Sequence, residues 1–121
     1  MLIAYTSRTG NVRKFVERTG FPSIRLEEDT VVNEPFVLVT YTSGFGQIPK
    51  NVVPFLTLNH QYLRGVSSSG NRNWGEKFGK AADSVSLLFG VPIINKFEHY
   101  GSEKDVAHFI EEVHEIEAHR A

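Results

Sequence analysis

The sequence contains no cysteine, no large excess of charge of either sign and no long apolar run. Without cysteine there can be no disulfide, thiol exchange or thiolate metal site, so any redox chemistry requires a bound cofactor. The 13 Lys and Arg residues nearly balance the 14 Asp and Glu residues, which argues against nucleic-acid or membrane partners. No segment approaches the roughly 18 apolar residues of a membrane span, and the N-terminus does not resemble a signal peptide. We therefore expect a cytoplasmic protein.

The chain alternates apolar runs typical of strands with stretches of helical periodicity. Its 121 residues are enough for one hydrophobic core, and we expect a single domain over 1–121. The expected strands are 1–5, a weak edge strand within 22–29, 35–41, 61–70 and 91–97. The expected helices are 11–20, 50–58, 78–90 and a C-terminal helix that begins at 102.

Three of these helices carry local signals that bear on the fold. Pro54 should disturb the helix over 50–58. The helix over 78–90 has an apolar stripe that includes Leu88 and Phe89, and Ser102 with Asp105 resembles a capping box. Strands alternating with helices predict an α/β fold, namely a doubly wound, parallel, five-stranded sheet of flavodoxin-like order 2-1-3-4-5 in three α/β/α layers.

In such a sheet, ligands bind at the carboxyl ends of the strands, and an anion-binding pattern follows the first strand. The residues are "SRTGN", 7–11, directly before a helix. The exposed N–H groups of a helix N-terminus attract anions, and Ser7, Thr9 and Asn11 add polar side chains, so a phosphate fits this loop. An ordinary turn capped by Thr9 or Asn11 explains the pattern about equally well.

The loop after the third strand contains "GFG", 44–46. Its two glycines allow the backbone to approach a flat ligand closely, and Gly44 is our candidate for a peptide that turns its carbonyl toward the ligand. A glycine-rich turn with Phe45 folded inward is an equal alternative. The loop is not a dinucleotide fingerprint, because Pro49 stands where the last glycine of that motif belongs.

The third loop, "SGNRNWG" at 69–75, holds the one tryptophan of the chain. Taken alone, Trp74 more simply begins a helix and packs in the core. Together with the two preceding loops, however, the segment suits a flat ring covered by Trp74 and hydrogen-bonded by Asn71 and Asn73. A phosphate site beside a site for a flat polar ring predicts FMN.

The three loops, "SRTGN", "TYTSGFG" and "SGNRNWG", closely resemble those of the NrdI family, flavodoxin-like proteins associated with class Ib ribonucleotide reductase. The resemblance implies FMN as cofactor. It places FMN at the following residues: Ser7, Arg8, Thr9, Gly10, Asn11, Val12, Thr42, Ser43, Gly44, Phe45, Gly46, Ser69, Gly70, Asn71, Arg72, Asn73, Trp74 and Gly75. It also implies that reduced flavin reacts with oxygen and supplies superoxide or peroxide to the dimanganese site of the reductase small subunit, where a tyrosyl radical forms.

The residues themselves add a point about charge. Segments 42–50 and 67–75 contain no Asp or Glu but do contain Lys50 and Arg72. Carboxylates around a flavin oppose its anionic, fully reduced form, so their scarcity predicts easy full reduction. Ile48 and Pro49, with Phe45, are candidates for an apolar docking rim at the flavin opening.

The remaining patterns indicate no second kind of chemistry. The histidines lack metal-ligand spacing and are expected at the surface, no protein metal site is predicted, and no side chain has an evident acid–base role. FMN would therefore carry out the redox chemistry, after its reduction by a separate, unidentified reductant. The alternatives are a general flavodoxin-type electron carrier, a phospho-receiver module, and a cofactor-free interaction domain; a receiver needs acidic residues that this chain lacks at Thr6, Ser7 and Thr42.

Overall fold

The computed structural model describes residues 1–44 and 46–119. Its strands are β1 (Leu2–Tyr5), β2 (Ser23–Arg25), β3 (Phe36–Tyr41), β4 (Leu63–Gly70) and β5 (Ile93–Glu98). Its α-helices are α1 (Asn11–Thr19), α2 (Val52–Asn59), α3 (Lys80–Phe89) and α4 (Glu103–Ala118), and the 3-10 helices η1 (His60–Tyr62) and η2 (Arg72–Lys77) flank β4. None of the helices in the described part of the chain has the length and apolar character to cross a membrane.

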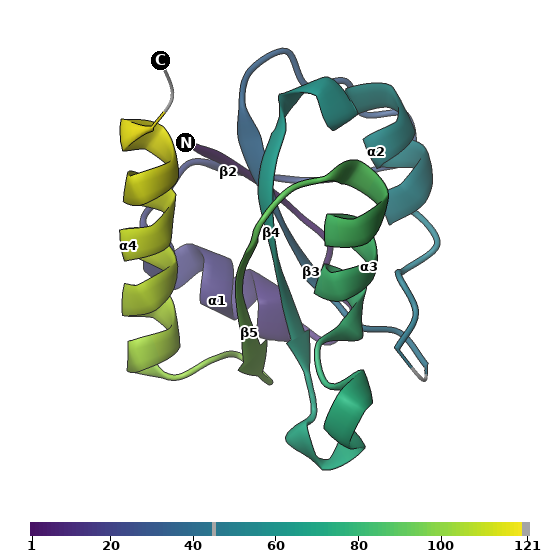
Figure 1. The fold of residues 1–121 in the computed structure, drawn as a ribbon, viewed down its shortest axis with the longest axis vertical. Coiled ribbons are helices and arrows are strands. Elements are labelled where there is room, and N and C mark those ends of the chain that lie inside the picture. Colours follow the sequence, from purple (N-terminus) through teal and green to yellow (C-terminus); the bar gives the residue numbers. More distant parts are fainter. Residues whose placement is uncertain (45, 120–121) are drawn as a thin grey trace.

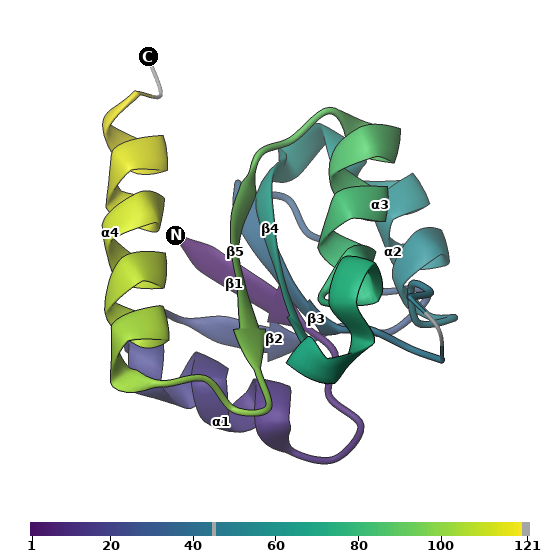
Figure 2. The same cartoon turned by 60° about the horizontal axis from the view of Figure 1, so that its bottom comes forward.

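The five strands form one parallel sheet in the order β2-β1-β3-β4-β5, which confirms the predicted fold class. Helices α1 and α4 cover one face and α2 and α3 cover the other (Figure 1). The same layers are visible after rotation, with β5 at one edge of the sheet (Figure 2). Strand order reverses between β1 and β3, so the adjoining loops diverge there and leave room for a ligand.

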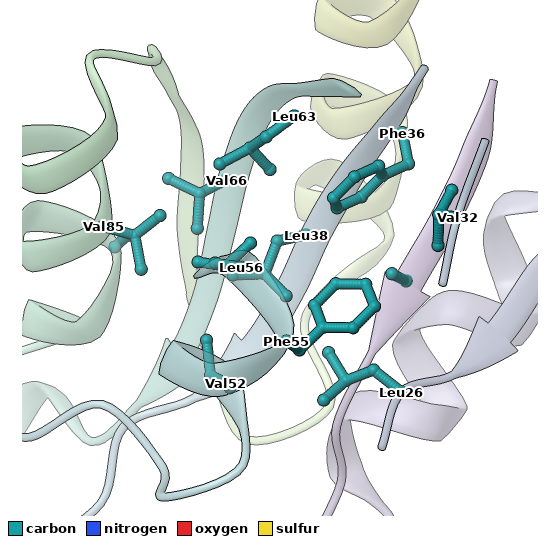
Figure 3. Packing of buried hydrophobic residues seen from close by; sticks show 12 residues of the cluster. Leu26, Val32, Phe36, Leu38, Val52, Phe55, Leu56, Leu63, Val66 and Val85 are labelled. Atoms are coloured by element: carbon teal, nitrogen blue, oxygen red, sulfur yellow. The ribbon is translucent and has the colours of Figure 1, made fainter. Parts of the chain in front are cut away.

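The central strand β3 is buried on both faces, as its unbroken apolar sequence predicts. Phe36 and Leu38 belong to the core beneath α2 and α3, whereas Val37 and Val39 belong to the core beneath α1 and α4. In Figure 3 the side chain of Phe55, from α2, lies beside Phe36, and their ring centroids are 5.5 Å apart. Alternate residues of one strand therefore anchor both helical layers.

Three local expectations need correction. Helix α2 forms although it contains Pro54, because this proline lies in the first turn, where a helix has no intrahelical partner for the N–H that proline lacks. Strand β4 begins at Leu63, since the preceding residues form η1. Leu88 is 64% exposed; only Phe89 of that adjacent pair packs against the core.

The last helix begins as its sequence predicts. The Ser102 side chain accepts a hydrogen bond from the Asp105 N–H at 3.1 Å, and the Asp105 carboxylate accepts one from the Ser102 N–H at 2.8 Å. This reciprocal capping box fixes the start of α4 directly after the loop that ends β5.

Candidate functional site

A pocket of about 180 Å³ lies at the carboxyl ends of the strands, where the loops after β1, β3, β4 and β5 meet. Its lining residues are Arg8, Thr9, Asn11, Tyr41, Thr42, Gly44, Ser69, Gly70, Asn71, Trp74, Lys77 and His99. Each of the three predicted loops contributes to this list. The topology therefore brings together segments that are far apart in the sequence, at the reversal of strand order.

The N-terminus of α1 is open toward an anion. Gly10 is its N-cap residue, with φ of 91°, and has no side chain with which to cap the helix, so the alternative cap by Thr9 or Asn11 is wrong. The hydroxyl of Ser7 accepts a 3.3 Å hydrogen bond from the N–H of Arg13. The other N–H groups of the first helical turn, those of Asn11 and Val12, have no intrahelical acceptor, which is the arrangement that suits a phosphate.

Hydroxyl side chains at the end of β4 tie the surrounding loops together. Ser68 Oγ donates to the carbonyl of Gly79 at 2.6 Å, and Ser69 Oγ donates to the carbonyl of His99 at 3.0 Å. The N–H of Thr42 donates to the carbonyl of Ser69 at 3.1 Å. These buried polar groups are thus satisfied by backbone atoms of the segments that surround the pocket.

Helix η2 places Trp74 at the pocket. The Asn71 side chain caps η2 by accepting from the Asn73 N–H at 2.9 Å, and the Trp74 N–H donates to the Asn71 carbonyl at 3.1 Å. Gly75 interrupts the helical turn with φ of 56° and ψ of −120°. Trp74 is 41% exposed and lines the pocket, so the alternative in which it packs as a core residue is wrong.

The pocket has aromatic and cationic walls. The guanidinium of Arg8 lies over the ring of Tyr41, with 5.4 Å from Cζ to the ring centroid. Among the described residues that line the pocket there is no Asp or Glu, whereas Arg8 and Lys77 are both present. The electrostatic environment therefore favours an anionic ligand.

The two cations expected from the sequence lie elsewhere. The guanidinium of Arg72 lies over the ring of Phe78, 4.7 Å from its centroid, and its Nε is 3.9 Å from Oε1 of Glu98. The other carboxylate oxygen of Glu98, Oε2, accepts a 3.1 Å hydrogen bond from the backbone N–H of Arg72. Lys50 lines a separate hollow beside Arg8. Glu98 was not predicted to lie beside the third loop, because this carboxylate comes from the end of β5.

Several predicted contacts belong to the three loops without lining the pocket: Ser7, Gly10, Val12, Ser43, Gly46, Arg72, Asn73 and Gly75. The side chain of Val12 is buried in the core beneath α1. Phe45 lies outside the described residues. Of the proposed apolar rim, Pro49 is buried and Ile48 packs against the core, so these two do not form an exposed rim.

Sequence reasoning missed three lining residues, Tyr41, Lys77 and His99. Tyr41 ends β3 and directly precedes a predicted contact, so the rule that ligands bind at strand carboxyl ends would have included it. His99 follows β5 and would have been found by applying the same rule to the last strand. Lys77 had no signal, because the path of η2 is not evident from the sequence.

The fold, with a pocket at the carboxyl ends of its strands, defines a flavodoxin-like protein. Two solved structures share the fold over nearly the whole chain. Oxidised flavodoxin 1 from Bacillus cereus has a TM-score of 0.69 at 16% identity, covering 99% of this chain and 98% of its own. A short-chain flavodoxin associated with a non-canonical PDU bacterial microcompartment has a TM-score of 0.76 at 18% identity, covering 97% and 95%.

The sequence comparisons are more specific. The family described as NrdI flavodoxin-like matches residues 3–111. Protein NrdI of Bacillus licheniformis is 46% identical over 115 residues, covering 94% of this chain and 88% of that protein. The chain therefore belongs to the NrdI flavodoxin-like family, as its loop motifs predict. Its cofactor is FMN, which the start of α1 and an aromatic pocket without Asp or Glu among its described lining residues fit.

Proposed function

We propose that this chain is the FMN-dependent activator of a class Ib ribonucleotide reductase and acts in the cytoplasm on the small subunit. When bound and fully reduced, FMN would supply one electron to oxygen to form superoxide, or two electrons and two protons to form hydrogen peroxide. The dimanganese site of the small subunit uses this oxidant to generate its tyrosyl radical, and a separate reductant restores the reduced flavin. Family membership and the three loop motifs support this assignment.

Different residues of the pocket would bind different parts of FMN. The N–H groups around Gly10 and Asn11, at the start of α1, would hold the phosphate. Tyr41 and Trp74 would contact the ring system, because both line the pocket and both have flat apolar faces. The predicted contacts in 42–46 and 69–75 would supply backbone groups to the polar edge of the ring.

The observation that carries the proposal is the absence of carboxylates among the described residues of the pocket lining. Full reduction gives the flavin a negative charge, and nearby carboxylates would oppose it while Arg8 and Lys77 favour it. We expect the second one-electron reduction to occur at an accessible potential. An activator needs this property, because it must reach the fully reduced state before it meets oxygen.

The test is an anaerobic reductive titration of the FMN-loaded protein, with both one-electron potentials extracted from spectra. Two closely spaced potentials, followed by rapid oxidation on mixing with oxygen, support the proposal. A strongly depressed second potential would identify a general electron carrier instead. The second stage adds the reduced protein and oxygen to the manganese-loaded small subunit, with tyrosyl radical measured by electron paramagnetic resonance and oxygen-free mixing as the control.

A further inference from the structure

His99 adopts an unusual backbone conformation at the edge of the pocket. Its φ is 54°, and within the described ranges it is the one residue other than glycine with a positive φ. A side chain disfavours this conformation sterically, although histidine tolerates it better than most residues. Such conformations persist where the surroundings impose them, and they cluster at ligand-binding sites.

Hydrogen bonds from two directions impose this conformation. The N–H of His99 donates to the carbonyl of Gly70 at 3.3 Å, and its own carbonyl accepts from Ser69 Oγ at 3.0 Å. On the other side, Arg18 Nη1 donates to the carbonyls of Tyr100 at 2.7 Å and Gly101 at 3.1 Å. The segment after β5 is therefore fixed to β4 and to α1.

His99 lies at the pocket, where its backbone conformation can serve ligand binding. His99 lines the pocket together with Asn71 and Trp74, and it is the residue by which the β5 end contributes to that pocket. It also lines the neighbouring hollow formed with Arg72 and Glu98, so it separates the pocket from this ion pair. An imidazole has at least one N–H donor in either protonation state.

We propose that His99 contacts FMN and donates a hydrogen bond from its imidazole to a polar edge of the flavin ring. The inference rests on the proposed FMN site. Oxygens and nitrogens along the polar edge of the flavin ring accept hydrogen bonds, and they accept more strongly when reduction adds negative charge to the ring. His99 therefore binds the fully reduced flavin more tightly than the oxidised flavin, and its strained backbone is retained for that contact.

The experiment compares four variants with the unmodified chain: His99→Gly, His99→Asn, His99→Ala and, as a matched control, His108→Ala from the exposed side of α4. Thermal unfolding of each apoprotein measures the strain. Fluorescence titration gives the Kd for oxidised FMN, and the potentials convert it to the Kd for reduced FMN.

We expect His99→Gly to raise the Tm of the apoprotein, because glycine adopts φ of 54° freely. We expect it to weaken oxidised FMN binding about threefold and reduced FMN binding about thirtyfold. That tenfold difference lowers the two-electron potential by about 30 mV. His99→Asn should lie between His99→Gly and the unmodified chain because it keeps a donor, and His108→Ala should match the unmodified chain.

Variants at His99 that bind both forms of FMN as the unmodified chain does would overturn the proposal, whatever their Tm. Equal weakening of both forms would also overturn it, since that pattern indicates a structural role. If His99→Gly does not fold, His99→Ala and His99→Asn decide by the same criteria. A failure of the FMN site itself is distinguishable, because the unmodified chain would then bind no FMN.

Discussion

The guanidinium of Arg25 donates a hydrogen bond to the backbone carbonyl of Ser7, with 2.7 Å between Nη2 and the oxygen. Arg25 ends the edge strand β2, and Ser7 lies in the loop that leads from β1 to α1. The neighbouring strand therefore holds the start of the proposed phosphate loop. This relationship gives the short edge strand a role in positioning the site.

Replacing Arg25 with Met should weaken FMN binding about fivefold. The loss of a partly exposed hydrogen bond from a charged group is worth about 1 kcal/mol here, and the loop it positions holds the phosphate. Isothermal titration with FMN and with riboflavin, which lacks the phosphate, measures the effect; riboflavin binding should not change. Arg64→Met is the control, because the Arg64 guanidinium donates to the nearby carbonyls of Gln61 and Leu63, at the start of β4. Equal losses for FMN and riboflavin would contradict the positioning role.

Two glycines at the ends of α1 allow a matched comparison. Gly10, the N-cap, has φ of 91°, and Gly20, the C-cap, has φ of 76°. Alanine at either position should lower the free energy of unfolding by about 1 kcal/mol, because a Cβ disfavours positive φ. Only Gly10→Ala should also weaken FMN binding, since it alone disturbs the helix end proposed to hold phosphate. Urea denaturation of the apoproteins and FMN titration test both parts, and FMN affinity that falls equally in both variants would argue against the phosphate site.

Trp74 provides an intrinsic probe, because the chain contains one tryptophan. If Trp74 contacts the flavin ring, titration with FMN should quench its fluorescence, and Trp74→Ala should weaken binding about tenfold. Stacking of an aromatic side chain on a flat ring of this kind is worth about 1 to 3 kcal/mol. Trp74→Phe should recover most of the affinity. Leu87→Ala, at a side chain that is 86% exposed on α3, is the control for loss of surface apolar area. FMN binding without quenching would place the ring elsewhere.

The order of the strands was predictable because the periodicity of the sequence changes clearly between strand and helix. Helices separate consecutive strands everywhere except between β2 and β3, and parallel β-α-β units admit few topologies. Details at helix ends were less predictable. The apolar stripe of α3 includes both Leu88 and Phe89. Only Phe89 packs against the core, whereas Leu88 is exposed to solvent.

The pocket was predictable where a local motif and a strand end coincide. Arg8, Thr42 and Trp74 belong to such motifs and line the pocket. The electrostatic detail depended on contacts between distant segments. Glu98, from β5, is the partner of Arg72, so Arg72 does not face the pocket as a lone cation. Ion pairs across strands have no local sequence signal, and they require the three-dimensional structure.

The described residues that line the pocket include no Asp or Glu, and the effect of this can be tested by adding a carboxylate. Thr42 lines the pocket, and its Oγ1 accepts a 3.4 Å hydrogen bond from the Ala81 N–H, which a carboxylate at this position can still accept. A unit charge about 8 Å from the flavin is worth about 2 kcal/mol at an effective dielectric constant of about 20. Thr42→Asp should therefore lower the second one-electron potential by about 90 mV.

The control for this prediction is Asn33→Asp, which adds the same charge in the exposed segment before β3, near the opposite end of the sheet. Its potentials should stay close to those of the unmodified chain, because the charge is separated from the site by the length of β3 and is screened by solvent. Spectroelectrochemistry at one pH and ionic strength gives both potentials for each variant. If Thr42→Asp leaves the second potential unchanged, pocket charge does not control full reduction. If it lowers that potential and also slows the reaction with oxygen, the lack of Asp and Glu among the described lining residues is what distinguishes this protein from an electron carrier.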